Sequence, residues 1–566
     1  MRRALAIAFV AAAALSAPAS AWAHAALLKT FPTASAEVDT PPAELRLVYD
    51  EVVEPRFAVI SVTDAAGHQQ VDGTVHRSPS NPYELDAPLK RSAEGWYLVF
   101  WRVISADGHP VRGAFLYRIG PNPGPSPQFV IPNLSETAVT PGLISFRWLT
   151  FLTTMAAIGL FVMRTVTARP VVSRVAGTQL RALSWAFGIA VTLALVVTPI
   201  YVLLATAQFA IRSFWSFGSL IPLMDVSAFG RGYLRLELLL TLFAAAAAVA
   251  IWLDRPERPS RSIAGLLSLW GALLAAGAVL LVPGAAGHAA QTAPRSASLL
   301  LDWFHLASGS LWIGGLIGLL VLWRSLPVAQ RTAGLVVSVP RFSNTAFVSV
   351  LVLLGSGVGA AVIHLPTLTS LWQTGYGKAI LVKAGLLLAA MLVASVNLLR
   401  TKPSLGRDPN AAVLLRRLVS IEVVLVTAAI VTAAVLSSLP PPPKALASLG
   451  APAATVGPGP VTQVVEHGAY RAEVRVTPNK VAVPDAFAVR LTRNGSPVRG
   501  ATVIVTFAML DMEMPTQAYR LAETSAGLYQ RSSEALVMVG RWGLTFEIQP
   551  SGAAAFDVVV VDHAHG

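Results

Sequence analysis

The chain has 566 residues, of which 54% are hydrophobic and only 13% are charged. Soluble globular proteins carry about 25% charged residues and disordered chains are poor in apolar residues, so both classes are excluded. The lack of cysteine excludes disulfides and thiolate metal sites, and the net charge of +13 arises in the apolar middle of the chain, which indicates membrane topology rather than nucleic-acid binding.

The N-terminus has the three parts of a secretory signal peptide. Residues 1–3 include two arginines, residues 5–15 are apolar, and Ala21-Trp22-Ala23 is an A-x-A cleavage site. We therefore expect residues 1–23 to be a signal peptide whose removal makes His24 the new N-terminus. The alternative is an uncleaved membrane anchor.

Short strand-like runs separated by turn residues follow the leader. They cover residues 44–51, 57–64, 96–104 and 113–120. This pattern predicts a small β-sandwich over residues 24–122.

Eight apolar runs of about 20 residues, the length that crosses a bilayer, fill residues 141–438. We place them at residues 142–163, 182–204, 233–253, 263–283, 299–323, 345–364, 379–399 and 415–437. Arginine and lysine are concentrated in the loops after the odd-numbered runs. The positive-inside rule then places both flanking domains outside the cytoplasm, on a multi-pass protein of the cytoplasmic membrane. Gly314 and Gly318 are spaced for close helix contact.

A proline-rich segment ends the apolar region and leads to a second strand-rich region. We take residues 439–460 as a linker and residues 461–566 as a C-terminal β-sandwich, with strands expected near 501–509, 543–548 and 556–562. Neither β region has a glycine-rich phosphate loop or a nucleophile motif. We therefore expect a multidomain membrane protein that is not an enzyme.

Candidate metal ligands occur at the start of the first β domain. A free N-terminal His24 offers an amine and an imidazole, and Asp107 and His109 offer a carboxylate and a second imidazole. In an extended chain residues two apart face the same way, and a set of three nitrogens and one oxygen suits Cu(II). The alternative for Asp107 and His109 is a solvated turn.

Three further histidines lie at the predicted outer ends of the spans. They are His288, His305 and His364. Asp302 and His305 share a helix face, so we expect Asp302 to orient His305 within a copper path through the membrane. The alternative is interfacial histidines that hydrogen-bond to backbone carbonyls.

The segment at residues 101–113, which reads WRVISADGHPVRG, strongly resembles the signature of CopC, a periplasmic copper-binding β protein. The resemblance implies that His24, Asp107 and His109 are Cu(II) ligands. Glu51 matches an acidic position of that family without an assigned role.

Two other segments of the chain carry further resemblances. Residues 287–290, 302–306 and 311–315 resemble CopD, the membrane partner of CopC, and this implies a CopC–CopD fusion. Residues 511–515 and 540–543 resemble the YtkA-like family of small extracytoplasmic β domains.

Two methionines in the last domain are also candidate ligands. Met512 and Met514 would share one face of a strand, and their thioethers select Cu(I). The alternative is ordinary packing in a β core.

Together these observations predict copper binding outside the cytoplasm coupled to copper transport across the membrane, in the direction of import. Two alternatives stay open: copper resistance by sequestration or by delivery to extracytoplasmic cuproenzymes, and a membrane haem redox protein with His288, His305 or His364 as axial ligands. The expected partners are copper ions, membrane lipid, and a copper chaperone or cuproenzyme, with no nucleic acid. The sequence leaves the oligomeric state open.

Overall fold

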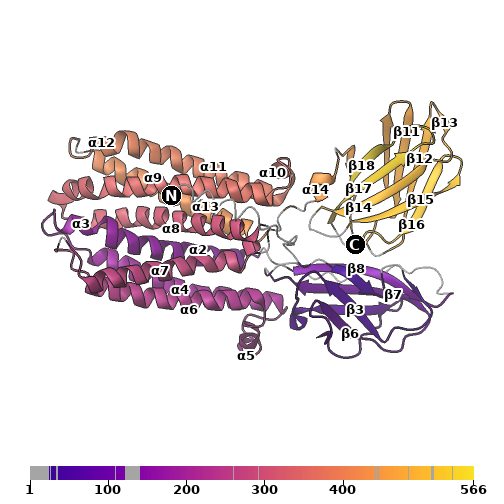
Figure 1. The fold of residues 1–566 in the computed structure, drawn as a ribbon, viewed down its shortest axis with the longest axis horizontal. Coiled ribbons are helices and arrows are strands. Elements are labelled where there is room, and N and C mark those ends of the chain that lie inside the picture. The colour runs from indigo at the N-terminus through magenta and orange to yellow at the C-terminus, as the bar shows by residue number, and fades with distance from the viewer. Residues whose placement is uncertain are drawn as a thin grey trace, which may run out of the picture. The chain divides into compact units, whose positions relative to one another are not determined.

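The computed structural model describes residues 25–565 apart from residues 26, 34–35, 107, 109, 122–139, 259, 291, 293, 409, 440–441, 443–444, 451, 482, 511–515 and 538–539. The chain forms two compact units. One is helical and spans residues 137–365 and 371–439. The other holds both β domains together with residues 366–370 (Figure 1).

The helical unit has eight helices that are long and apolar enough to cross a membrane, as the sequence predicts. They are α2 (Pro141–Val162), α4 (Arg181–Phe209), α6 (Ala228–Leu253), α7 (Ile263–Ala285), α8 (Arg295–Ser325), α9 (Arg331–His364), α11 (Gly375–Val396) and α13 (Ala411–Leu436). Side chains at the N-caps Thr140, Ser227, Ser262 and Thr374 each accept a backbone N–H of the first helical turn. Each cap satisfies an N–H group that has no partner within the helix, so these residues mark where the helices begin.

Short elements connect the long helices. They are α3 (Arg169–Val172), α5 (Phe217–Leu220), η3 (Ile221–Leu223), η4 (His288–Ala290), η5 (Val328–Gln330), α10 (Ser370–Gln373) and α12 (Lys402–Ser404). One more short helix, α14 (Ala445–Ser448), follows the last long helix and precedes β9. Two π-helical turns, η2 (Met163–Thr167) and η6 (Asn397–Thr401), extend α2 and α11.

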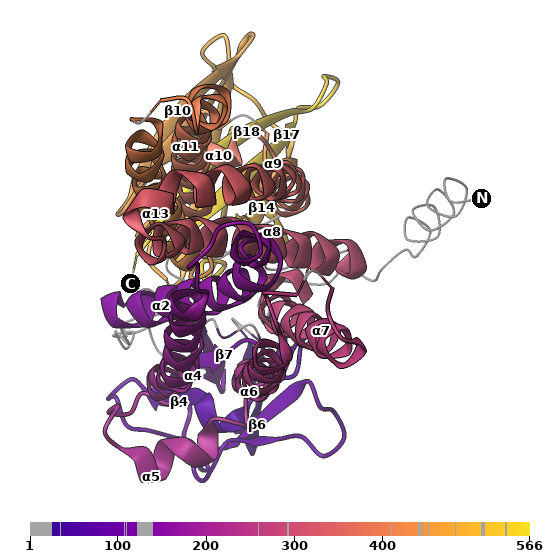
Figure 2. The same cartoon turned by 90° about the vertical axis from the view of Figure 1, so that its left-hand side faces the viewer.

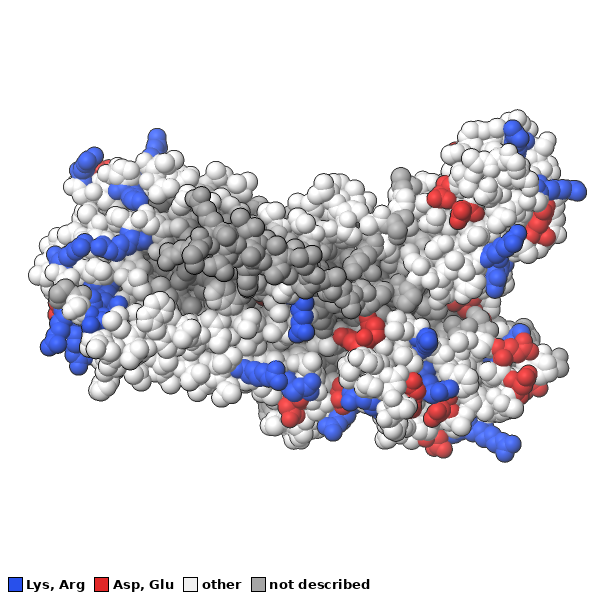
Figure 3. Space-filling model, in the orientation of Figure 1, with Lys and Arg blue, Asp and Glu red and all other residues white. Residues whose placement is uncertain are grey.

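We call the end of the bundle where α2 begins the Pro141 end, and the opposite end the Asp254 end. Lys and Arg gather at the Asp254 end, around α3 and α12 (Figure 3).

Helix α8 lies at the centre of the bundle and contacts α2, α7, α9 and α13 (Figure 2). Its closest approach is to α2. A Cβ added to Gly314 would lie 2.4 Å from the Gly159 Cα, and one added to Gly318 would lie 2.4 Å from the Met163 Cγ. Only glycine permits these contacts, so the close helix approach predicted from Gly314 and Gly318 is confirmed.

The N-terminal β domain has two four-stranded sheets, in the orders β1-β3-β6-β5 and β2-β8-β7-β4. Its elements are β1 (Leu27–Phe31), β2 (Glu37–Val38), β3 (Glu44–Tyr49), η1 (Pro55–Phe57), β4 (Val59–Asp64), β5 (His76–Arg77), β6 (Glu84–Pro88), β7 (Gly95–Ile104) and β8 (Pro110–Ile119). The last two strands form an antiparallel hairpin that pairs Ile104 with Pro110. The hairpin therefore brackets the segment that resembles CopC.

The C-terminal domain is also β-rich, as the sequence predicts. Its strands follow the order β10-β11-β12-β16-β15-β14-β17-β18-β9, with β13 on β12. They are β9 (Ala454–Val456), β10 (Val461–His467), β11 (Tyr470–Thr477), β12 (Asp485–Arg493), β13 (Ser496–Pro497), β14 (Thr502–Met509), β15 (Gln517–Ser525), β16 (Leu528–Ser533), β17 (Gly540–Gln549) and β18 (Phe556–Ala564).

Strand β7 is apolar on both faces, and the β unit buries both. Val99 and Trp101 pack into the core of the N-terminal domain. Leu98 and Phe100, on the opposite face, belong to the hydrophobic core of the C-terminal domain. The Ala114 N–H of β8 also donates to the Val537 carbonyl at 2.9 Å. The two β domains therefore share apolar contacts rather than standing as separate sandwiches.

Candidate metal centre

The expected Cu(II) ligands His24, Asp107 and His109 lie outside the described residues, as do Met512 and Met514. The chain neighbours of the first set are described. The Ala25 N–H donates to the Ser105 Oγ at 3.3 Å, and Ala25 and Ser105 are both 1% exposed. This contact holds the residue after His24 beside the start of the β7–β8 connection.

Glu51 fixes the same connection. Its Oε1 accepts a hydrogen bond from the Ser105 hydroxyl at 2.6 Å and another from the Ala106 N–H at 2.8 Å. A carboxylate with two donors holds this turn firmly in place. The acidic position that sequence comparison left without a role thus supports the connection that carries Asp107 and His109.

His305 joins three membrane helices. Its Nδ1 lies 3.2 Å from the Ser356 Oγ of α9, and its Nε2 lies 3.2 Å from the Lys383 Nζ of α11. A lysine ammonium only donates, so Nε2 accepts and the ring proton resides on Nδ1. Ser356 accepts from that Nδ1 and donates its own proton to the Val352 carbonyl at 2.7 Å. The network fixes a neutral imidazole whose Nε2 lone pair faces Lys383.

Asp302 lies one helical turn before His305 and faces α7. A Cβ added to Gly284 would approach its Oδ2 to 2.5 Å, so Gly284 makes room for the carboxylate. Ser356 and Lys383, rather than Asp302, contact the ring nitrogens of His305 in this structure.

His364 ends α9 and has a different setting. Its Nδ1 donates to the Ala360 carbonyl of its own helix at 2.8 Å, and its Nε2 lies 3.3 Å from the Thr292 Oγ1. His305 lies beside Gly357, where an added Cβ would reach its Cε1 at 3.3 Å. At 1.5 Å per residue, His364 is about 10 Å further along α9.

The side chains of His305 and His364, the two membrane histidines that the structure describes, have separate hydrogen-bond partners. The backbone of His288 forms part of η4, and its side chain lies outside the described atoms. Among the described residues no three His, Asp or Glu side chains come together to hold a metal ion.

Comparison with known proteins identifies three segments of the chain. Family models match residues 27–120 to the CopC domain, residues 336–436 to copper resistance protein D (CopD), and residues 465–547 to YtkA-like proteins. The copper transport protein CutJ of Bacillus subtilis is 26% identical over 541 residues, which cover 93% of both chains. The chain belongs to the CopC–CopD fusion family and has a C-terminal YtkA-like domain.

Two shorter relatives match the CopC-like domain alone. Protein YobA of Escherichia coli is 32% identical over 101 residues, which cover 18% of this chain and 82% of YobA. Copper resistance protein C of Xanthomonas campestris is 31% identical and is covered over 96% of its length. The crystal structure of CopC from Methylosinus trichosporium is 30% identical, with 18% of this chain and all of that chain covered and a TM-score of 0.17.

Two residues that contact His305 were not predicted as its partners. Ser356 is an ordinary helix residue by sequence, and Lys383 stands out only because it is a lysine within an apolar span. The structure brings the Lys383 Nζ to His305, while Glu422 accepts a hydrogen bond from Asn397.

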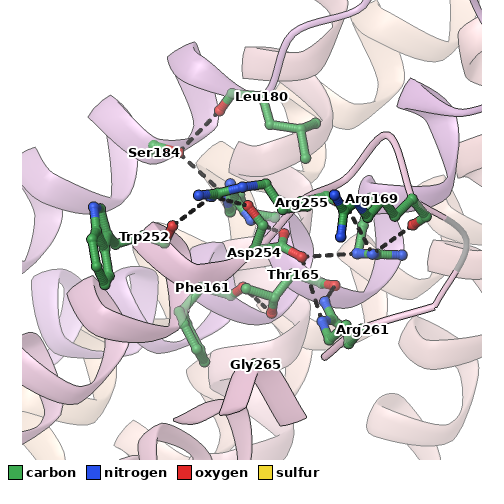
Figure 4. A network of polar contacts seen from close by, with 12 residues as sticks. Phe161, Thr165, Arg169, Leu180, Ser184, Trp252, Asp254, Arg255, Arg261 and Gly265 are labelled. Atoms are coloured by element: carbon green, nitrogen blue, oxygen red, sulfur yellow. Dashed lines mark hydrogen bonds and ion pairs between the residues drawn. The ribbon is translucent and has the colours of Figure 1, made fainter. Parts of the chain in front are cut away.

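A second polar network lies at the Asp254 end of the CopD-like bundle (Figure 4). Asp254 is 2% exposed at its side chain and forms ion pairs with Arg164, with Arg169 at 2.9 Å and with Arg261 at 3.5 Å. Burial favours the neutral acid, but hydrogen bonds from Arg169 and Arg164 and the nearby positive charges outweigh it and hold the pKa of Asp254 below its ordinary value. Asp254 is therefore an ionised anchor for three guanidinium groups.

The same arginines also bond to the backbone. Arg169 donates to the carbonyls of Arg255 and Arg258 at 3.1 and 2.8 Å, and Arg261 donates to the Thr165 carbonyl. These bonds connect the end of α2 to the loop between α6 and α7. The network therefore joins helix ends.

Proposed function

We propose that this protein is a copper transporter rather than an enzyme, and that it captures copper outside the cytoplasm and moves it inward through the CopD-like bundle. The relationship to a copper transport protein along nearly the whole chain supports this proposal. The observation that carries it is His305, a neutral imidazole inside a membrane bundle with its Nε2 lone pair facing a single lysine. Neutral imidazole is a common ligand for copper.

Capture begins at the CopC-like domain. His24, Asp107 and His109 bind Cu(II) in this proposal. The contacts among Ala25, Ser105 and Glu51 support it, because they hold the neighbours of these residues together. The YtkA-like domain then supplies a Cu(I) ligand pair, Met512 and Met514, or a surface where a copper chaperone docks.

The membrane route passes His288, His364 and His305. The accumulation of Lys and Arg at the Asp254 end supports a cytoplasmic position for that end in this proposal, because the positive-inside rule favours it. The signal peptide and the extracytoplasmic β domains expected from the sequence agree with this orientation. Copper reaches His305 from the Pro141 end, and the Lys383 ammonium must leave Nε2 for the metal to bind.

The decisive experiment is internal copper, measured by mass spectrometry in cells with and without the protein under limiting copper. Import predicts that cells with the wild-type protein contain more internal copper than cells without it. Cells with His305→Ala should contain the same amount as cells without the protein. His68→Ala is the matched control, because the side chain of His68 is 76% exposed and bonds only Asp64 among the described residues. It should accumulate copper like the wild type.

The alternatives predict other results. Sequestration or delivery predicts unchanged or lower internal copper and copper-sensitive growth when the protein is deleted. A haem redox protein predicts a Soret band in the visible spectrum of the purified chain. Either result would overturn the import proposal.

A further inference from the structure

A second cluster of polar side chains lies nearer the Asp254 end, where helix α13 meets the two helices that hold His305 and Lys383. Glu422 of α13 is 3% exposed and accepts a hydrogen bond from the Asn397 Nδ2 at 2.5 Å. The side chain of Trp312 on α8, which is 1% exposed, hydrogen-bonds Glu422 as well. This group therefore lies where α8, α13 and the end of α11 meet.

The group includes oxygen atoms without donors. The Asn397 Oδ1 and the Thr401 Oγ1 are buried and have no hydrogen-bond partner among the described residues. Both belong to the π-helical turn η6, and such turns occur frequently at functional sites. Buried acceptors without donors require an explanation, and a bound cation is one that satisfies several at once.

No described cation pairs with the Glu422 carboxylate. On α11, Lys383 contacts His305 and lies about 21 Å from Asn397 along the helix axis. On α13, Arg416 stacks over the Trp323 ring. On α2, Arg147 bonds Tyr201 and Ser438. A carboxylate inside a membrane bundle without a cationic partner is costly and marks ion pathways.

We propose that Glu422, Asn397 and Thr401 form a second binding station for the transported copper ion, between His305 and the Asp254 end. This inference rests on the proposed transport function. Trp312 follows His305 by about 10 Å along α8, so the two stations are a short step apart. Carboxylate, amide and hydroxyl oxygens bind copper less tightly than imidazole. The second station therefore favours release, and conduction requires sites that an ion can leave.

The test is the initial rate of radioactive copper uptake in cells producing the full chain. Glu422→Gln is nearly isosteric and keeps a carbonyl that accepts from Asn397, so a merely structural role predicts little change. The station predicts a fall of about tenfold or more, the scale on which altered metal surroundings act. Copper binding to the purified variant at His305 should stay as in the wild type.

Glu237→Gln is the matched control. Glu237 lies in α6, and its Oε2 is also buried without a described partner, but α6 packs against α4 and α7 rather than α13. This variant should take up copper like the wild type. Thr401→Val, which removes only a hydroxyl, should lower uptake by a smaller factor and keeps the test valid if Glu422→Gln fails to fold.

The outcomes separate the two proposals. If the wild type takes up no more copper than His305→Ala, the transport proposal fails. If the wild type transports and Glu422→Gln and Thr401→Val both stay within twofold of it, the second station fails alone. If both variants lose uptake and also lose copper binding at His305, their effect is on the fold, and the station is likewise rejected.

Discussion

The helical unit buries charged groups around Asp254 and around His305, and the two places differ in how their groups are satisfied. At Asp254 one carboxylate faces three guanidinium groups, and the Nη2 of Arg169 donates to two backbone carbonyls. At His305 the Lys383 Nζ donates to the imidazole Nε2. Three guanidinium groups repel a metal ion at the first place, whereas at the second the metal need only displace one lysine. The comparison suggests that a buried polar cluster supports binding when one of its acceptors is held by a movable donor.

The largest expected effect comes from removing the charge at Asp254. Asp254→Asn leaves Arg164, Arg169 and Arg261 buried without their anion, and breaking a buried ion pair from one side costs about 3–5 kcal/mol. We expect a large loss of folded protein in membranes and a much lower unfolding temperature for the purified chain. Asp408→Asn, at an exposed loop aspartate, is the control and should melt like the wild type. Equal melting of both variants would show that the network is not a structural anchor.

A smaller effect, on binding rather than on folding, is expected at Lys383. Lys383→Leu removes the donor that competes with a metal for the His305 Nε2 and adds no ligand atom. We expect copper affinity of the purified chain to rise by about tenfold, or 1.4 kcal/mol, with little change in melting temperature. Lys378→Leu, at an exposed lysine near the start of α11, is the control. A lower affinity in Lys383→Leu would mean that the lysine supports the metal instead of competing with it.

Much of the architecture could be predicted from the sequence because it depends on local pattern. The eight apolar runs have the length of a bilayer, and Gly314 predicts a close contact whichever helix provides the partner. The contact of His305 with Ser356 and Lys383 could not be predicted, because it depends on how α8, α9 and α11 are rotated about their axes. The apolar run of β7 likewise predicts a strand buried on both faces without saying what covers the second face.

The third expected effect is gradual, spread over several pH units, and lies in the YtkA-like domain, which also buries unbalanced charge. Asp485 is completely buried, and its Oδ1 accepts the N–H groups of Asn479 and Lys480 at 2.6 and 3.2 Å. Its Oδ2 has no partner among the described atoms. Burial, with a smaller contribution from the negative charge of Asp562, raises the pKa of Asp485 to about 7.

This raised pKa gives the folded domain a definite pH dependence. The folded state binds the Asp485 proton more tightly than the unfolded chain, so protonation of Asp485 stabilises the fold. This stabilisation is complete below the ordinary aspartate pKa of about 4 and is lost as the pH rises through 7. We expect the free energy of unfolding to fall by about 1 kcal/mol for each pH unit across this window. The fall should appear as faster hydrogen exchange in β12 and β18 after correction for the intrinsic rate. Asp485→Asn should remove this slope, and Asp557→Asn, at an exposed position of β18, should keep it.

A flat wild-type profile would show that Asp485 ionises normally. A slope that disappears in Asp485→Asn while copper binding is unchanged would show that a buried carboxylate without a cation can be neutral structure. Charge imbalance alone would then not mark a binding site. A second observation would be required, such as the movable donor at His305 or the oxygens of η6 that lack a described donor beside Glu422.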